Sequence, residues 1–287
     1  MTDDPFTAHR SLLFTVAYEM LGSAADADDV VQETWLRWAD VDRATVREPR
    51  AYLVRMVTRQ ALNRLRTVSR RREDYVGEWL PEPLLTSPDV AEDVELADSV
   101  SIAMLTVLET LRPAERAVFV LREVFDVPYE EIAEVVGKSP AAVRQIGHRA
   151  REHVAARRPR MPVDRFEQQA ALAEFLAAVS TGDVQRLLAV LAPDVVLISD
   201  GGGVVAAARA PITGAAKVGA LLSRLVTLPG LTTTPAWFNG AAGARLDAGG
   251  EATAISVEVQ NGRITRIYAI RNPAKLGWLD RVTTLRR

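Results

Sequence analysis

Four arginines at helical spacing give one segment of the chain a face that could bind phosphate groups. A helix is predicted over about 49–70, and the four side chains fall within about 60° of one another around its axis at 100° per residue. Each guanidinium can form bidentate, charge-assisted hydrogen bonds to phosphate oxygens. Because residues 50–72 contain eight arginines and no acidic residue, this face would repel itself without a polyanion, and it predicts contact with a nucleic-acid backbone rather than a solvated surface alone. The four residues are Arg55, Arg59, Arg66 and Arg70.

A second basic segment has the pattern of a helix-turn-helix. A short helix over 128–136 ends at Gly137, which can adopt a positive φ, and Ser139 can cap the helix that follows. Residues 138–160 carry seven Lys or Arg against one acidic residue. We expect the second helix to lie in a DNA major groove. The residues expected to contact DNA are Ser139, Arg144, Gln145, His148, Arg149 and Arg151, and those expected to pack inward are Val143, Ile146, Ala150 and Val154.

These two basic blocks lie on helical units that an acidic segment separates. Residues 73–99 contain nine acidic residues and no basic one, and three prolines keep the first half of this segment extended. Beyond residue 162, glycines and short alternating apolar segments become frequent. The sequence therefore predicts a first helical unit over 1–72, a linker over 73–97, a second helical unit over 98–158 and a mixed domain over 164–287.

The mixed domain is predicted to have an α+β fold. The segment 252–260 alternates polar and apolar residues with period two, and Asn261-Gly262 is a strong hairpin turn. Helices followed by a curved antiparallel sheet predict a cone that encloses a pocket. The helices are expected over 163–179, 183–191 and 214–227, and the strands over 194–199, 237–238, 244–247, 252–260 and 262–272.

The composition excludes several classes of protein and site. The chain has 287 residues, a net charge of −2 and no cysteine, so it offers no disulfide, thiolate nucleophile or Cys-ligated zinc site. It contains no uninterrupted apolar run of roughly 18 residues, so no membrane helix is expected. The small net charge hides the separated basic and acidic blocks. We therefore expect a cytoplasmic protein that binds nucleic acid, without membrane contact, metal or cofactor.

The first helical unit resembles region 2 of a bacterial sigma factor of the extracytoplasmic-function group in the sigma-70 family. Asp28-Asp29-Val30-Val31-Gln32-Glu33-Thr34-Trp35 resembles region 2.2, and Pro49-Arg50-Ala51-Tyr52-Leu53 through Asn63-Arg64-Leu65-Arg66 and Arg70–Arg72 resemble regions 2.3 and 2.4. The resemblance implies binding to the β′ and β subunits of the RNA polymerase core and to promoter DNA. It places the polymerase contacts, chiefly with β′, at Asp29, Gln32, Glu33 and Trp35, and the −10 contacts at Arg55, Arg59, Asn63, Arg66 and Arg70.

The second helical unit resembles region 4, which reads the −35 element. The similar motifs are Leu111-Arg112-Pro113-Ala114-Glu115-Arg116, Gly137-Lys138-Ser139-Pro140 and His148-Arg149-Ala150-Arg151. The resemblance also implies that the acidic linker lies in the RNA path of polymerase and that the loop 40–48 holds a base extruded from the DNA. Trp35 and Trp38 could stack on that base, but their helical spacing favours packing in the core.

Three short motifs resemble the SigJ-like subgroup of these factors, which carries a SnoaL-like C-terminal extension. The resemblance implies a multidomain protein with two all-α sigma domains, a region 2 bundle and a region 4 helix-turn-helix, followed by an α+β SnoaL/NTF2-like cone with a regulatory role. Two positions depart from the subgroup pattern, Val204 in place of Lys and Ala274 in place of Asp. The interdomain contacts are expected at Trp79, Pro81, Glu82, Pro83, Asp200, Gly201, Gly202, Gly203, Asn272, Pro273, Lys275 and Leu276.

Two other functions are open for the cone, because cones of this kind include cyclases and isomerases. One is an enzyme, which would need a positioned acid or base. Residues 161–287 contain no His or Cys, and Asp200, the best carboxylate, precedes three glycines and is more simply explained as a turn cap. The other is a sensor for an unknown small ligand in the pocket. We expect that the chain is no enzyme and has no catalytic residue.

Overall fold

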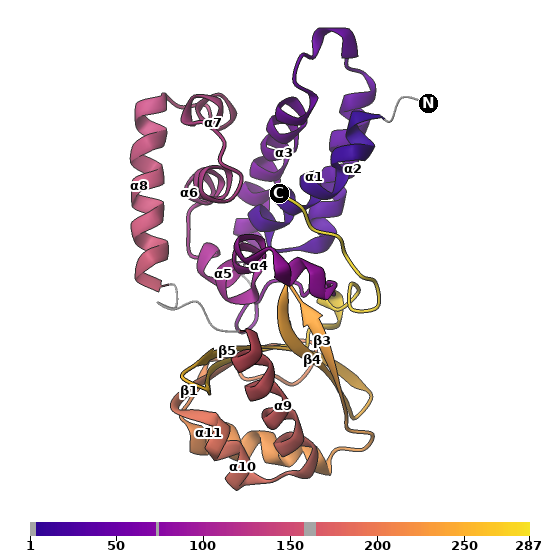
Figure 1. The fold of residues 1–287 in the computed structure, drawn as a ribbon, viewed down its shortest axis with the longest axis vertical. Helices are drawn as coiled ribbons and strands as arrows, with labels where there is room; N and C mark the ends of the chain where they lie inside the picture. The colour runs from indigo at the N-terminus through magenta and orange to yellow at the C-terminus, as the bar shows by residue number, and fades with distance from the viewer. Residues whose placement is uncertain (1–3, 73–74, 158–164) are drawn as a thin grey trace.

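The computed structural model describes residues 4–72, 75–157 and 165–287. A helical part occupies one end of the molecule, and a domain built on a sheet packs against it at the other end (Figure 1). Each helix in the described ranges is too short or too polar to span a bilayer.

The first helical unit is a three-helix bundle. It contains α1 (Pro5–Leu21), α2 (Ala24–Ala39), a short turn η1 (Arg43–Thr45) and α3 (Pro49–Arg72). Val54, Val57, Ala61 and Leu65 of α3 are buried against the other two helices, as the helical periodicity predicts. The face of α3 that carries the arginines is therefore turned away from this bundle's core.

The second helical unit contains the predicted helix-turn-helix. Gly137 ends α7 with a φ of 68°, and Val143, Ile146, Ala150 and Val154 of α8 are buried as expected. A helix that begins at Pro113 changes to a π-helical turn after Phe119. η2 (Pro88–Glu92) and the start of α4 (Val94–Val100) belong to the end of the linker, and the further elements of the unit are α5 (Ile102–Leu108), α6 (Pro113–Phe119), η3 (Val120–Val124), α7 (Tyr129–Val136) and α8 (Pro140–Arg157).

The two helical units share one hydrophobic core, which the sequence does not predict. A single cluster of buried side chains runs from α1, α2 and α3 into α4 through α8. Helix α3 contacts α6 and α7, and α1 contacts η3. Helix α8 lies on the outer side of the assembly, away from α3 (Figure 1). The structure thus describes a closed arrangement of the two units.

The C-terminal domain is the expected α+β cone. It contains the helices α9 (Arg165–Thr181), α10 (Val184–Val190) and α11 (Ala215–Leu222) and the turn η4 (Ser223–Thr227). Its six-stranded sheet has the order β2-β1-β6-β5-β4-β3. The strands are β1 (Leu191–Asp200), β2 (Ile212–Thr213), β3 (Thr232–Phe238), β4 (Ala241–Ala248), β5 (Glu251–Gln260) and β6 (Arg263–Ile270).

The prediction of a purely antiparallel sheet is wrong at one pair of strands. β1 and β6 are parallel, with Ile198 opposite Tyr268 and Asp200 opposite Ile270. Parallel strands need a long connection, and here it runs through α11 and the β3–β5 meander. The two strands therefore end at the same edge of the sheet, which places Asp200 beside the segment that follows β6.

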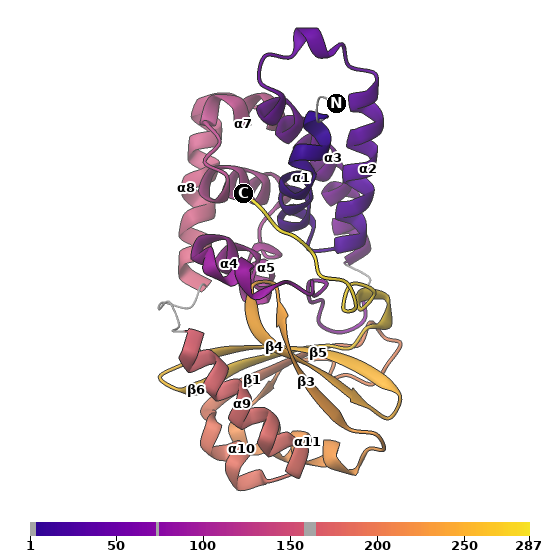
Figure 2. The same cartoon turned by 45° about the vertical axis from the view of Figure 1, so that its right-hand side comes forward.

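The two faces of the sheet have different partners. Helices α9, α10 and α11 cover one face, and the helical units lie beyond the other (Figure 2). On that second face Phe238, Tyr268 and Ile270 form a small apolar cluster with Leu80 of the linker and Ile102 of α5. The linker segment 80–84 is therefore a buried layer between the cone and the helical units.

Two glycines that end helices provide a test of the closed arrangement. Gly22 after α1 and Gly137 after α7 have φ values of 65° and 68°, so alanine is strained at both. A Cβ on Gly22 would lie 2.7 Å from Glu109 Oε1 and 2.9 Å from Trp79 Cη2, whereas a Cβ on Gly137 meets nothing within 4 Å.

We expect Gly137→Ala to lower the free energy of unfolding by about 1 kcal/mol and Gly22→Ala by about 1 kcal/mol more. The extra loss arises because the new methyl group must displace side chains of the linker and of the second helical unit. Urea unfolding of both variants measures the difference. Equal losses would contradict the close contact at Gly22.

Candidate nucleic-acid interfaces and interdomain junction

The arginine face of α3 is only partly open to solvent. Arg59, Asn63 and Arg66 are exposed and Arg55 is half-buried. The side chain of Arg70 lies outside the described residues. An accessible row of guanidiniums therefore covers the middle of α3, as the sequence predicts.

Helix α7 covers the first part of this arginine face. Arg55 Nη1 lies 3.1 Å from Glu131 Oε2, and Arg59 Nη2 donates a hydrogen bond to the backbone oxygen of Glu134 at 3.4 Å. A carboxylate and a carbonyl oxygen thus occupy positions where phosphate oxygens would bind. The half-buried Arg55 can bind a DNA phosphate only after α7 has moved away, whereas the exposed Arg59 is only partly occupied by its contact with α7.

The outward face of α8 is exposed along its length. Ser139, Arg144, Gln145, His148, Arg149 and Arg151 are all exposed. The Ser139 hydroxyl accepts a hydrogen bond from the backbone N–H of Ala142 at 3.3 Å, so it caps the helix as expected. Arg144 pairs with Glu130 at 3.1 Å and Arg151 with Glu123 at 3.0 Å, which holds both side chains over the preceding helices. This face is accessible in the closed arrangement.

Helix α2 presents the predicted polymerase contacts on its solvent side. Asp29, Gln32 and Glu33 are exposed. Arg64 of α3 lies 3.2 Å from Asp29 Oδ2 and 3.4 Å from Glu33 Oε1, so it holds the two carboxylates on one side of the helix. This role of Arg64 is not visible in the sequence pattern.

The expectation that both tryptophans of α2 pack in the core is correct only for Trp38. Trp38 is 1% exposed, and its Nε1 donates a hydrogen bond to Asp4 Oδ1 at 3.2 Å. Trp35 is 49% exposed, because the three-residue step between the two side chains turns it about 60° away from the buried face. Trp35 is therefore exposed on α2 but points to another side of the helix than Asp29 and Glu33.

Asp200 is the centre of the junction between cone and linker. Its side chain is fully buried and accepts hydrogen bonds from Tyr75 Oη at 2.6 Å, from the backbone N–H of Leu80 at 2.9 Å and from that of Gly202 at 3.0 Å. The interpretation of Asp200 as a turn cap is thus incomplete, because the same carboxylate also binds the linker.

Lys275 completes this buried group. Its Nζ lies 2.6 Å from Asp200 Oδ2 and donates to the backbone oxygen of Leu80 at 2.6 Å. The ammonium also lies over two aromatic rings, 3.9 Å from the centroid of Trp79 and 4.8 Å from that of Tyr75. The departures at Val204 and Ala274 leave this ion pair intact, because both are exposed residues next to it.

The remaining motif residues shape the junction around this ion pair. Asn272 donates to Tyr75 Oη at 2.8 Å, and a Cβ on Gly202 would collide with the Asn272 side chain, so this position requires glycine. Gly203 approaches Val76 of the linker. Pro81, Pro83 and Gly201 are buried, Leu276 packs at the edge of the apolar cluster on the sheet, and Pro273 begins the short turn η5 (Pro273–Lys275).

Glu82 binds the first helical unit rather than the cone. Its carboxylate accepts hydrogen bonds from Ser23 Oγ at 2.7 Å and from the backbone N–H groups of Ala24 and Ala25 at 2.8 and 3.2 Å. It therefore caps the N-terminus of α2, where a negative charge is favourable. Burial raises the pKa of Glu82, and the hydrogen bond from Ser23 opposes this shift.

Asn239 is a junction residue that the sequence analysis missed. It is fully buried, its Oδ1 accepts from the backbone N–H of Leu84 at 2.9 Å, and its Nδ2 donates to Tyr18 Oη at 2.7 Å and to the backbone oxygen of Val100 at 2.9 Å. One amide thus joins the cone, the linker and both helical units. The Asn-Gly pair at 239–240 signals a turn, but its burial follows from tertiary contacts alone.

A second buried ionic group joins the two helical units. Arg116 of α6 is 1% exposed, donates from Nε to the backbone oxygen of Glu19 at 2.9 Å and forms an ion pair with Glu109. Glu19 is fully buried and accepts a hydrogen bond from Ser99 Oγ at 2.8 Å. Burial raises the pKa of Glu19 to about 8 and lowers that of Arg116 to about 9.

Two substitutions test the junction. Lys275→Met removes the ammonium and leaves the Asp200 carboxylate buried without its counter-ion, so we expect it to lower the free energy of unfolding by about 3–5 kcal/mol. Adding Asp200→Asn to the Lys275→Met variant removes the unpaired carboxylate charge. We expect this double variant to recover part of the lost free energy of unfolding. Chemical unfolding of the two single variants and the double variant measures the coupling. Additive losses would show that the two groups do not interact.

Comparisons with known proteins agree with both helical units. Residues 6–71 match the family Sigma-70 region 2, and residues 101–154 match the family Sigma-70, region 4. The chain is 37% identical over 286 residues to the ECF RNA polymerase sigma factor SigJ of Mycobacterium tuberculosis, which covers 94% of this chain and 91% of the relative. It is 32% identical over 274 residues to the probable ECF RNA polymerase sigma factor SigI of the same species, covering 94% of this chain and 92% of the relative.

The crystal structure of SigJ from Mycobacterium tuberculosis extends the similarity to the whole fold. It is 34% identical in sequence and superimposes with a TM-score of 0.76 over 94% of this chain and 96% of that chain. The match therefore includes the C-terminal cone. The chain belongs to the extracytoplasmic-function sigma factors of the sigma-70 family, which direct RNA polymerase to promoters.

Proposed function

We propose that α2 binds the polymerase core, that the arginine face of α3 binds the −10 element, that α8 binds the −35 element, and that the cone controls these contacts through the linker. The four units follow the boundaries 1–72, 73–97, 98–158 and 164–287. A factor of this kind works in the cytoplasm, where polymerase and DNA are found. Its partners in this proposal are the β′ and β subunits and promoter DNA.

The polymerase-binding part rests on the surface of α2. Asp29 and Glu33 are held together by Arg64, and Trp35 is 49% exposed on another side of the same helix. An exposed aromatic ring on a helix is typical of a protein interface, since aromatic residues are enriched at such interfaces. Since this surface is not covered in the closed arrangement, polymerase can meet α2 first.

The regulatory part rests on one observation, the burial of the linker between two partners. The segment 80–84 is buried, and its residues bond to the cone at Asp200 and Asn239 and to α1 and α2 through Glu82. A linker held in this way cannot extend into the RNA path of polymerase. We therefore propose that the cone must release the linker before initiation.

The chain is proposed to have no enzymatic activity. Asp200, the best candidate for a general base in the cone, is fully buried and already accepts hydrogen bonds from the linker and Lys275. Because the Asp200 carboxylate is bonded within the junction, it does not face a substrate. A small ligand for the cone stays a prediction of the sequence.

The docking assignment predicts a defect in holoenzyme formation. We expect Asp29→Ala combined with Glu33→Ala to weaken binding to the polymerase core by at least about tenfold, because charged partners at the interface lose their counter-ions. Fluorescence anisotropy with labelled factor measures the affinity. Glu174→Ala, which removes an exposed carboxylate on the cone, is the control and should leave it unchanged. Unaltered binding by the double variant would contradict the assignment.

The regulatory assignment predicts that the cone changes promoter use. We expect a variant ending at residue 160 and the full-length variant Lys275→Met to differ from the natural chain in transcription from a promoter library in vitro. The natural chain with Glu174→Ala again serves as the control. If both altered proteins initiate at the same promoters with the same yield as the natural chain, the cone has no regulatory role.

A further inference from the structure

The segment after the cone runs back along the helical units. Residues 277–287, here called the strap, leave the sheet domain and reach the region between α3 and α4 (Figures 1 and 2). None of the three interdomain motifs lies in this segment. Its contacts are therefore separate from the junction around Asp200.

The first half of the strap is tied to the cone and the linker. Leu279 is 6% exposed and packs in the apolar cluster on the sheet. Asp280 pairs with Arg245 of β4 at 2.8 Å. The backbone N–H of Thr283 donates to the backbone oxygen of Leu85 at 2.7 Å. These contacts hold the first half of the strap against the cone and the linker.

The strap then attaches to α1. The ring of Trp278 packs on Phe14 with 5.6 Å between the ring centroids, and the backbone N–H of Arg286 donates to Thr15 Oγ1 at 3.0 Å. Leu285 is 4% exposed and belongs to the hydrophobic core that the two helical units share. The strap thus contributes a side chain to the core that exists only in the closed arrangement.

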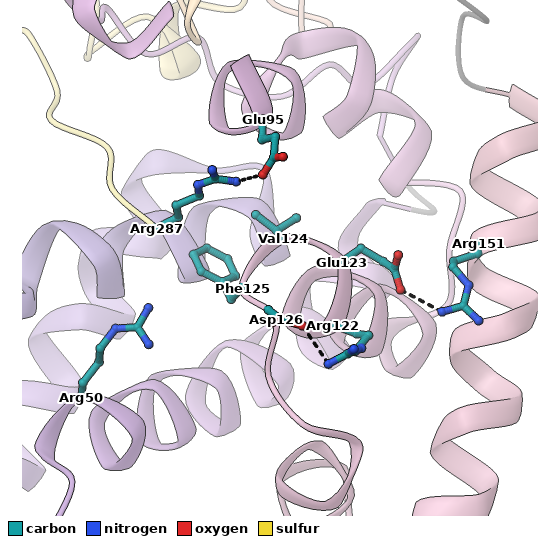
Figure 3. Close-up of a pocket in the computed structure, with 9 residues that line it drawn as sticks. All are labelled: Arg50, Glu95, Arg122, Glu123, Val124, Phe125, Asp126, Arg151 and Arg287. Carbon is teal, nitrogen blue, oxygen red and sulfur yellow. Dashed lines mark hydrogen bonds and ion pairs between the residues drawn. The ribbon is translucent and has the colours of Figure 1, made fainter. Parts of the chain in front are cut away.

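Arg287 reaches the boundary between the two helical units. Its Nε lies 3.2 Å from Asp93 Oδ2, and it forms a second ion pair with Glu95 of α4. It borders a cavity of about 570 Å³ whose walls come from both units (Figure 3). Arg50 of α3 lines one side, and Arg122 and Arg151 of the second unit line the other. The strap therefore crosses the boundary at which the two helical units would separate.

We propose that the strap is a latch that holds the two helical units in the arrangement in which α7 covers Arg55 and binds Arg59. The direct contact between α3 and α7 includes a half-exposed ion pair, which is weak by itself. The strap adds the buried Leu285 and the pairs of Arg287 to the same closed state. Its release removes part of what stabilises the closed state and shifts the equilibrium toward arrangements in which the whole arginine face is open to DNA. This inference rests on the proposed role of that face in binding DNA.

The absence of native cysteine makes the latch directly measurable. Cysteines introduced at the exposed positions Thr67 of α3 and Ala141 of α8 carry a donor and an acceptor dye without other labelling sites. Energy transfer between the dyes then reports the separation of the two units in the full chain. Binding of a mixed-sequence single-stranded DNA, followed by anisotropy, reports access to the arginine face.

We expect Leu285→Asp to lower the energy transfer and to raise the affinity for single-stranded DNA by at least about fivefold, the lower end of typical coupling between sites. Val282→Ser is the matched control, because Val282 is a strap residue with 58% of its surface exposed. Val282→Ser should change neither the energy transfer nor the affinity for single-stranded DNA.

A charge exchange tests the latch without altering the core. Arg287→Glu should also lower the energy transfer, because it meets Asp93 and Glu95, and adding Glu95→Arg should restore it. Unchanged energy transfer in both Leu285→Asp and Arg287→Glu overturns the latch. A fall in energy transfer without tighter DNA binding supports the latch and instead contradicts the DNA-binding role proposed for the arginine face.

Discussion

The buried ion pair between Asp200 and Lys275 is the interaction on which the arrangement of the molecule depends. A charge in a protein interior is tolerated only when its partners are in place, and here the partners come from the cone and the linker together. The carboxylate binds the backbone of Leu80, and the ammonium binds the same residue and the rings of Trp79 and Tyr75. The two charges compensate each other within the cone, but their remaining hydrogen bonds and the contact of the ammonium with the aromatic rings form only when the linker lies against the sheet.

The rest of the closed arrangement follows from the position of the linker. When Leu80 is bound to the cone, Glu82 lies at the start of α2 and Leu84 hydrogen-bonds to Asn239. The hydroxyl of Tyr18 in α1 then bonds to Glu82 of the linker and to Asn239 of the cone. The second helical unit is attached to the same place through Val100 and through the buried hydrogen bond from Arg116 to the backbone oxygen of Glu19. Polar groups that are buried and bonded in this way favour one relative orientation of the domains.

The sequence predicts local features of this protein well and contacts between domains poorly. Helical periodicity identifies the buried stripe of α3 and the outward face of α8, and Gly137 and Ser139 mark the turn and the cap between α7 and α8. The parallel pairing of β1 with β6 is not visible in an alternating pattern, yet it is this pairing that places Asp200 beside Asn272 and Lys275. Trp35 and Trp38 share a helix and a residue type, and only the packing of α1 and α3 decides which of them is buried. Asn239 and Arg116 carry no sequence signal of their burial, because their partners are distant in the chain.

The cap on α2 has a consequence for the order in which the protein is made. Glu82 follows the first residue of α2 by 58 positions, so the linker carboxylate leaves the ribosome after all of α1, α2 and α3. Until then the first turn of α2 has only Ser23 to satisfy its free N–H groups. The first helical unit can therefore collapse during synthesis, as N-terminal domains generally do, while its second helix is completed only when the linker arrives. Completion of the helix that carries Asp29 and Glu33 therefore depends on a segment outside its own bundle.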